Sequence, residues 1–146
     1  ISAVKLRFSL QEEFELELNH LDVLTKYLKE IIIEDCIVIL RGDLASGKTT
    51  LVKNYVKALG LADLVTSPTF SLQAIYSNDI FHYDVYNKTL SEFISLGMLE
   101  EFEKHGVHFV EWGDEKLEEI LNDYGYKVIL IEIEKKDNKR LYKINA

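Results

Sequence analysis

The residues from Gly42 to Thr50 have the types and the spacing to bind phosphate groups. They read GDLASGKTT, so Gly42, Gly47, Lys48 and Thr49 occupy the fixed positions of the pattern G-x-x-x-x-G-K-[ST]. In a loop this rich in small residues, successive backbone N–H groups can turn inward around phosphate oxygens. The Lys48 ammonium can reach the β- and γ-phosphates, and the Thr49 hydroxyl can bind Mg²⁺. The stretch therefore predicts a nucleoside-triphosphate site.

The segments on either side of this loop have the order that the pattern requires. The run Cys36–Leu40 before it is continuously apolar, which is typical of a strand buried on both faces. After it, apolar residues recur at helical spacing from Thr50 to Gly60, where the glycine is a stop signal. A helix in this place adds its free N–H groups and the positive end of its dipole to the site.

Two carboxylates lie near the ends of predicted strands. Asp84 belongs to a strand expected over Ile80–Tyr86, and Glu111 nearly ends one expected over Val107–Trp112. Ligands bind at the carboxyl ends of strands in open α/β sheets, and phosphate-loop enzymes place an acid there beside the metal. For Asp84 we favour a role at the phosphate site. For Glu111, spacing alone leaves a position beside the metal and a position on the surface equally open.

Two other features near the predicted site have simple structural interpretations. His82 shares the polar face of its strand with Asp84, and we interpret it as a half-exposed strand histidine. The stretch Leu64–Phe70 holds Pro68, the only proline of the chain, beside three hydroxyl side chains. A surface turn and a loop that senses the γ-phosphate fit this stretch equally well.

The remaining periodicities complete an α/β pattern in a single domain over residues 1–146. We expect a phosphate-loop fold with a mostly parallel central sheet, flanking helices and an antiparallel hairpin portion. The further strands are predicted at Val4–Phe8, Phe14–Leu18, Ser71–Tyr76, Tyr126–Ile133 and Arg140–Ile144. The further helices are predicted after an N-cap at Asn19, from a capping box at Thr89–Glu92, at Met98–Phe102 and at Asp114–Asn122.

Composition excludes several classes of protein. The 146 residues are 47% hydrophobic and 29% charged, as in an ordinary globular domain, and carry a formal net charge of −8. Such a charge, without a basic face, indicates that any contact with nucleic acid is delegated to a partner. There is no membrane-length apolar stretch and no signal-peptide pattern. The single cysteine, Cys36, has no partner for an internal disulfide, so we expect a cytoplasmic protein.

The class of nucleotide reaction is less constrained than the site itself. The chain lacks an N-K-x-D element for guanine, which favours ATP over GTP. Arginine occurs only at Arg7, Arg41 and Arg140, and neither Arg41 nor Arg140 is an obvious lid residue. We therefore expect an ATPase that is slow alone and is gated by a partner. A small-molecule kinase with Asp84 as general base and a non-hydrolysing, nucleotide-dependent binding module remain the alternatives.

Five motifs in order resemble the TsaE family, the small bacterial ATPases required for the threonylcarbamoyladenosine (t6A) modification of tRNA. In this chain they read GDLASGKTT, TSPTFSL, FHYDVY, SLGMLEEF and VHFVEWGDE. The resemblance spans about Phe14 to Ile133 and leaves residues 1–12 outside it as a candidate N-terminal extension. It implies a cytoplasmic protein that hydrolyses ATP to ADP with Mg²⁺ and works with TsaB and TsaD, through which tRNA is mainly contacted.

The resemblance also implies roles for individual residues. Thr49 and Glu111 would bind Mg²⁺, Asp84 would order the attacking water or the metal shell, and Thr69 would face the γ-phosphate. Trp112 would lie beside the nucleotide, whose phosphates would be held by the loop residues Gly42, Asp43, Leu44, Ala45, Ser46, Gly47, Lys48, Thr49 and Thr50. The family usually has Gly at the position of Ala45 and tends to have Arg at that of Asn87.

Overall fold

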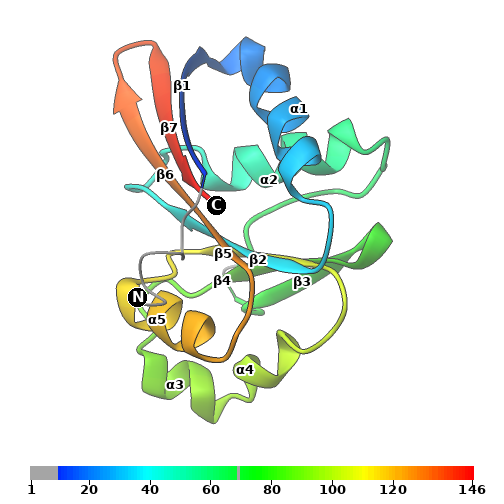
Figure 1. Ribbon diagram of the computed structural model, residues 1–146, viewed down its shortest axis with the longest axis vertical. Helices are drawn as coiled ribbons and strands as arrows, with labels where there is room; N and C mark the ends of the chain where they lie inside the picture. The colour runs from blue at the N-terminus through cyan, green and yellow to red at the C-terminus, as the bar shows by residue number, and fades with distance from the viewer. Residues whose placement is uncertain (1–9, 69) are drawn as a thin grey trace.

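The computed structural model describes residues 10–68 and 70–146, whose strands form one seven-stranded sheet in the order β1-β7-β6-β2-β5-β4-β3 (Figure 1). The strands are β1 Gln11–Glu17, β2 Cys36–Arg41, β3 Gln73–Tyr76, β4 Ile80–Asp84, β5 Val107–Glu111, β6 Val128–Lys136 and β7 Lys139–Asn145. The helices are α1 Leu21–Ile31, α2 Lys48–Ala58, α3 Leu90–Ser95, α4 Met98–Glu101 and α5 Glu115–Asp123.

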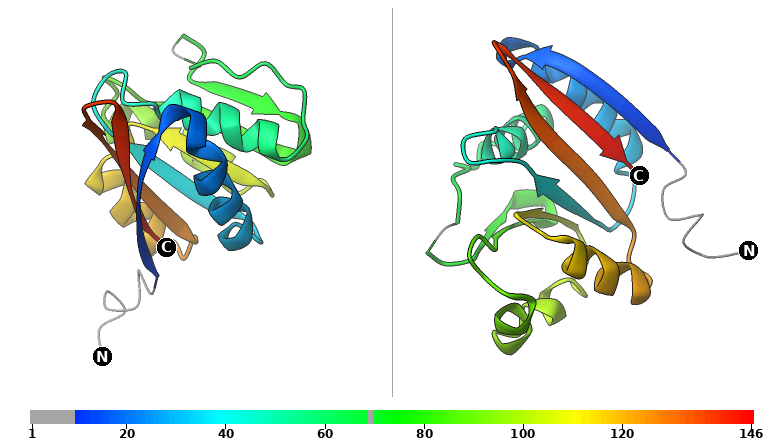
Figure 2. Two further views of the ribbon diagram at one scale, coloured as in Figure 1. Left: turned by 90° about the horizontal axis from the view of Figure 1, so that it is seen from above. Right: turned by 90° about the vertical axis from the view of Figure 1, so that its left-hand side faces the viewer.

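The centre of the sheet is parallel and its two sides are antiparallel. Strands β6, β2, β5 and β4 run in the same direction. On one side β7 pairs antiparallel with β6, and β1 pairs antiparallel with β7 (Figure 2). On the other side β3 pairs antiparallel with β4. The predicted α/β class, with its parallel centre and antiparallel hairpin portion, is confirmed. Because the central strands are parallel, the chain leaves all of them at the same edge of the sheet.

Helices cover both faces of the sheet (Figure 1). Helices α1 and α2 pack on one face with Val38 and Leu40 of β2, whereas α3, α4 and α5 pack on the other with Ile37 and Ile39. Alternate side chains of β2 thus enter two different cores, which explains why its sequence is continuously apolar. None of the helices within residues 10–68 and 70–146 is long and apolar enough to cross a membrane.

Most helix ends follow their sequence signals. The capping box is confirmed, since Thr89 accepts from the Glu92 N–H and Glu92 accepts from the Thr89 N–H. The predicted Asn19 cap is wrong, because a short 3₁₀ turn over Leu18–His20 intervenes and α1 follows His20 without a side-chain cap. The strand predicted at Val4–Phe8 lies outside the described residues.

Candidate active site

The residues predicted to handle phosphate converge on a cavity of about 560 Å³ at the carboxyl edge of the sheet. This phosphate cavity is lined by Leu44, Ala45, Ser46, Gly47, Lys48, Thr49, Thr50, Ser67, Asp84, Tyr86, Glu111 and Trp112. Gly42 and Asp43 line a second cavity of about 620 Å³, which shares Ser46 and Trp112 with the first. Strand pairing explains the convergence, since Glu111 of β5 lies opposite both Leu40 of β2 and Asp84 of β4.

The loop between β2 and α2 needs its glycines for two different reasons. Gly47 has a φ of +108°, a backbone conformation that favours glycine. A Cβ at Gly42 would lie 2.7 Å from the Ile133 carbonyl oxygen and would also collide with Ser46. Ala45 has a φ of +58° and therefore carries its Cβ in a left-handed conformation.

The Lys48 ammonium is folded back onto the loop that precedes it. Its Nζ donates to the carbonyl oxygens of Gly42 at 2.6 Å and Asp43 at 3.0 Å, and lies 3.4 Å from the Ser46 hydroxyl. It also lies 3.7 Å from the centre of the Trp112 ring, a cation–π contact. Burial lowers the pKa of Lys48, while the charges of Glu111, Asp84 and Asp43 oppose that shift. An ammonium has three donors, so a phosphate must replace some of these contacts.

Thr49 and Glu111 form the oxygen-rich part of the cavity. The Thr49 hydroxyl donates to Oε2 of Glu111 at 2.6 Å, and Glu111 is 3% exposed, so a surface position for this acid is wrong. Hydroxyl and carboxylate oxygens are the ligands that Mg²⁺ prefers, usually together with waters and substrate phosphates. Among the described residues, no group of three or more acidic, histidine or cysteine side chains is placed to hold a metal ion. Thr49 and Glu111 thus have the chemistry to supply two of the ligands of a magnesium ion, the others being left to waters or phosphate oxygens.

Asp84 is held by the stretch that contains Pro68. Its Oδ2 accepts from the Ser67 hydroxyl at 2.6 Å, and its Oδ1 accepts from the Tyr86 N–H at 3.0 Å. Ser67 therefore lies in the phosphate cavity, and Pro68 is buried. The stretch is thus more than an exposed turn. Thr69 lies outside the described residues, and its place beside the γ-phosphate stays a prediction.

The interpretation of His82 as a half-exposed histidine is wrong. The side chain is fully buried, with Nε2 2.6 Å from Oε2 of Glu111 and Nδ1 2.9 Å from the Tyr76 hydroxyl. Alternation along β4 correctly places His82 and Asp84 on the same face. It fails to predict burial because this face belongs to the core beneath α1 and α2, to which Phe109, the neighbour of His82 in β5, also belongs.

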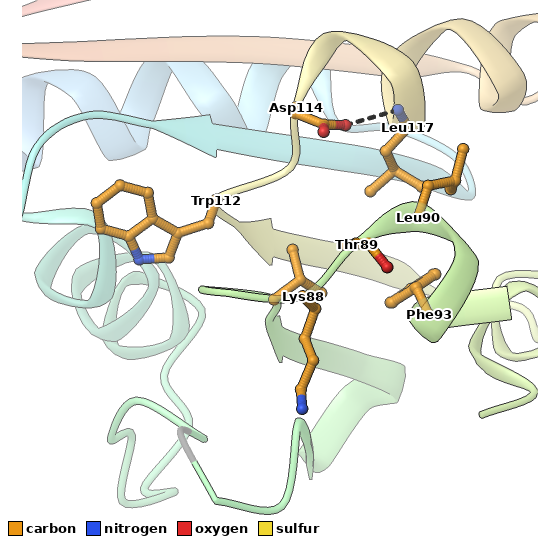
Figure 3. A pocket seen from close by; sticks show the side chains of 8 residues that line it. Lys88, Thr89, Leu90, Phe93, Trp112, Asp114 and Leu117 are labelled. Atoms are coloured by element: carbon orange, nitrogen blue, oxygen red, sulfur yellow. Dashed lines mark hydrogen bonds between the residues drawn. The ribbon is translucent and has the colours of Figure 1, made fainter. Parts of the chain in front are cut away.

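Trp112 separates the phosphate cavity from a much smaller one. It has a φ of +71°, a strained conformation for a bulky residue, and its ring packs on Tyr86 with centroids 4.7 Å apart. The small cavity, of about 20 Å³, lies toward Val85, Thr89 and Leu90, where Figure 3 also draws Lys88 with its ammonium directed away from Trp112. Asn87, two residues before Thr89, is exposed.

Both described arginines brace the loops around the site. Arg41 donates from Nε to the Gly113 carbonyl at 2.7 Å and from a terminal nitrogen to Glu118 at 2.7 Å. Arg140 donates from Nε to the Ser46 carbonyl at 3.1 Å, across 94 residues of sequence. Neither lines the phosphate cavity, although Arg41 lines the second cavity beside Gly42 and Asp43. Sequence reasoning missed both bracing contacts.

Comparison with known proteins gives one consistent result. The family model described as "Threonylcarbamoyl adenosine biosynthesis protein TsaE" matches residues 16–142. The chain is 39% identical over 90 residues to the tRNA threonylcarbamoyladenosine biosynthesis protein TsaE of Treponema pallidum, covering 60% of this chain and 67% of that protein. It is also 39% identical over 79 residues to the TsaE protein of Bacillus subtilis, covering 52% of this chain and 49% of that one. These aligned segments span between about half and two thirds of the relatives' own lengths.

A solved structure agrees on the fold. The crystal structure of Bacillus subtilis YdiB superposes with a TM-score of 0.68 and 24% sequence identity, covering 94% of this chain and 86% of that one. At this identity the likeness establishes the seven-stranded α/β architecture alone.

Proposed function

The chain belongs to the TsaE family, and we propose that it binds ATP with Mg²⁺ and hydrolyses it in support of tRNA t6A modification. The observation that carries this proposal is the meeting of Lys48, Thr49, Asp84 and Glu111 in one cavity, although they come from three separate segments of the chain. A glycine turn with only a structural role gives no reason for a lysine and two acids to gather around it.

Each of these groups has a defined task in phosphoryl transfer to water. The loop N–H groups and Lys48 hold the β- and γ-phosphates. Thr49 and Glu111 would hold Mg²⁺, which when bound would supply positive charge to the phosphate oxygens. Asp84 orders the attacking water through the lone pairs that its present donors, Ser67 and Tyr86, leave open. We expect hydrolysis by the isolated protein to be slow, because neither Arg41 nor Arg140 lines the phosphate cavity.

The missing contribution comes from partners. Neither Arg41 nor Arg140 lines the phosphate cavity, and both are engaged by neighbouring loops, so no arginine of the described residues is placed to stabilise the transferring phosphate. We assign this activation to TsaB and TsaD, in the cytoplasm. The acidic chain, with a net charge of −8, contacts tRNA mainly through them.

The test is phosphate release from ATP by the protein alone and with TsaB, TsaD and tRNA. We expect low release alone and a rise with the partners, and Lys48→Ala should lower ATP affinity at least 10-fold, about 1.4 kcal/mol or more. Lys53→Ala, an exposed lysine on the same helix, is the matched control and should bind as wild type does. Unchanged binding by Lys48→Ala would refute the site, and a phosphorylated metabolite instead of free phosphate would favour a kinase.

A further inference from the structure

We propose that His82 is a positioning residue for the magnesium site, where it holds the Glu111 carboxylate in the orientation that binds the ion. This inference rests on the proposed function, because it assigns a partner to a carboxylate whose own task is metal binding. His82 does not line the phosphate cavity, so its effect passes through Glu111.

Two donors converge on the same carboxylate oxygen. Oε2 of Glu111 lies 2.6 Å from the Thr49 hydroxyl and 2.6 Å from Nε2 of His82. An ionised carboxylate only accepts hydrogen bonds, so both neighbours must donate. Both contacts are short, as expected for hydrogen bonds to a charged acceptor. The contact with His82 is buried, whereas the contact with Thr49 borders the phosphate cavity.

The other ring nitrogen fixes the histidine from behind. Nδ1 lies 2.9 Å from the Tyr76 hydroxyl, which lies 3.3 Å from the Thr66 carbonyl oxygen. Tyr76 can donate to a neutral His82 or to Thr66 while it accepts from a charged His82. In both arrangements the Nε2 proton points at Glu111. The imidazole is thus held in one orientation whichever protonation state it has.

This network connects two parts of the candidate site that sequence keeps apart. It begins at Thr66 and ends at Thr49 in the first turn of α2. Thr66 is next to Ser67, whose hydroxyl donates to Asp84. A carboxylate fixed at one oxygen in this way loses little further conformational freedom when it binds a metal. Outer partners of metal ligands typically change metal affinity or activity by 10- to 100-fold.

The experiment measures binding of a non-hydrolysable ATP analogue by titration calorimetry, with Mg²⁺ and with the metal chelated. In the wild type, Mg²⁺ should tighten binding. His82→Ala should lose about 10-fold of that Mg²⁺-dependent gain, while metal-free binding stays the same. His82→Gln places an amide N–H near the Nε2 position and should keep most of the gain. His82→Asn places its amide near Nδ1, so it should lose the gain as His82→Ala does.

A second buried histidine supplies the matched control. His108 is 1% exposed and does not contact the phosphate cavity, so His108→Gln should leave the Mg²⁺ gain unchanged even if the protein becomes less stable. If His82→Ala does not fold, the difference between His82→Gln and His82→Asn decides. Equal Mg²⁺ gains in the wild type, His82→Ala and His82→Asn would overturn the role of His82 alone. A wild type without any Mg²⁺ gain would overturn the magnesium site itself.

Discussion

Two histidines lie in adjacent strands, almost equally buried, and do different things. In the pairing of β4 with β5, His82 lies opposite Phe109, and His108 lies opposite Phe81. Both rings have both nitrogens bonded, and each has a tyrosine hydroxyl at Nδ1, Tyr76 for His82 and Tyr83 for His108. They differ in what the Nε2 atom meets, which is the Glu111 carboxylate in one case and the Lys104 backbone carbonyl in the other.

The surroundings of His108 are those of a core residue. Its ring stacks on Phe81 with centroids 4.3 Å apart and meets Phe102 edge-on at 5.5 Å. Burial lowers the pKa of His108, which favours the neutral ring. In that form Nε2 donates to the Lys104 carbonyl oxygen, which can only accept, and Nδ1 accepts from the Tyr83 hydroxyl. All of its hydrogen-bonding capacity is used within the fold. A structural histidine and a histidine at the site therefore cannot be told apart by burial, or by whether both ring nitrogens are hydrogen-bonded. What distinguishes them is the group that Nε2 contacts, a carboxylate or a backbone carbonyl.

The sharpest test of this comparison is His108→Ala. The change leaves a cavity among aromatic rings and deprives the buried Tyr83 hydroxyl of its acceptor, so we expect a loss of about 2–4 kcal/mol in the free energy of unfolding. Urea unfolding followed by circular dichroism measures it, with His20→Ala, an exposed histidine, as control. A loss below about 1 kcal/mol would mean that His108 is not a core residue in the sense argued.

Lowering the pH should reduce the contribution of His108 to the free energy of unfolding, by less than the substitution His108→Ala does. Because its pKa is lowered in the folded state, the unfolded chain takes up this proton first as the pH falls. Its contribution to stability is therefore complete above the ordinary histidine pKa of 6.5 and decreases below it, at most by about 1.4 kcal/mol per pH unit for one proton.

The measurement is the pH dependence of unfolding in wild type and His108→Gln. The variant should lose stability less steeply between pH 6.5 and lower values. The difference between the two proteins is the informative quantity, because hydrogen bonding to Asp35 raises the pKa of the exposed His105 and shifts stability in the opposite direction. Parallel pH profiles would show that His108 does not titrate differently in the folded state.

The smallest effect concerns backbone strain, which also differs between the two ends of the sheet. Ala45 and Trp112 line the phosphate cavity and have positive φ angles, whereas near His108 the positive φ angles belong to Gly106, Asn78 and Asp79, which tolerate them better. Ala45→Gly should therefore stabilise the protein by about 0.5–1 kcal/mol in thermal or urea unfolding. Destabilisation would mean that the Ala45 methyl group makes contacts that outweigh the strain.

Much of this architecture could be predicted from local pattern. The apolar run of β2, the phosphate loop and the Thr89 capping box depend on neighbours in sequence, so periodicity and spacing predict them well. The alternation of β4 also placed Asp84 on the correct face. The alternation did not predict that this face is buried, because His82 is buried by residues such as Glu111, which is 29 positions away.

The same limit explains the missed arginines and the wrong helix cap. Nothing near Arg140 in sequence indicates that its guanidinium meets the Ser46 carbonyl, since this depends on β7 folding back along β6. Asn19 has the side chain of a good cap, but the 3₁₀ turn over Leu18–His20 moves the start of α1 past it. Propensity describes a residue, whereas strand order decides what lies opposite it.

The position of Trp112 has a practical consequence. It is the only tryptophan in the chain, and its indole lies 3.7 Å from the Lys48 ammonium and packs on Tyr86 at the phosphate cavity. Indole emission from the whole molecule therefore originates at this one place. When a ligand draws Lys48 away, the emission should change, so the native fluorescence of the protein reports occupancy without a label and without background from any second tryptophan.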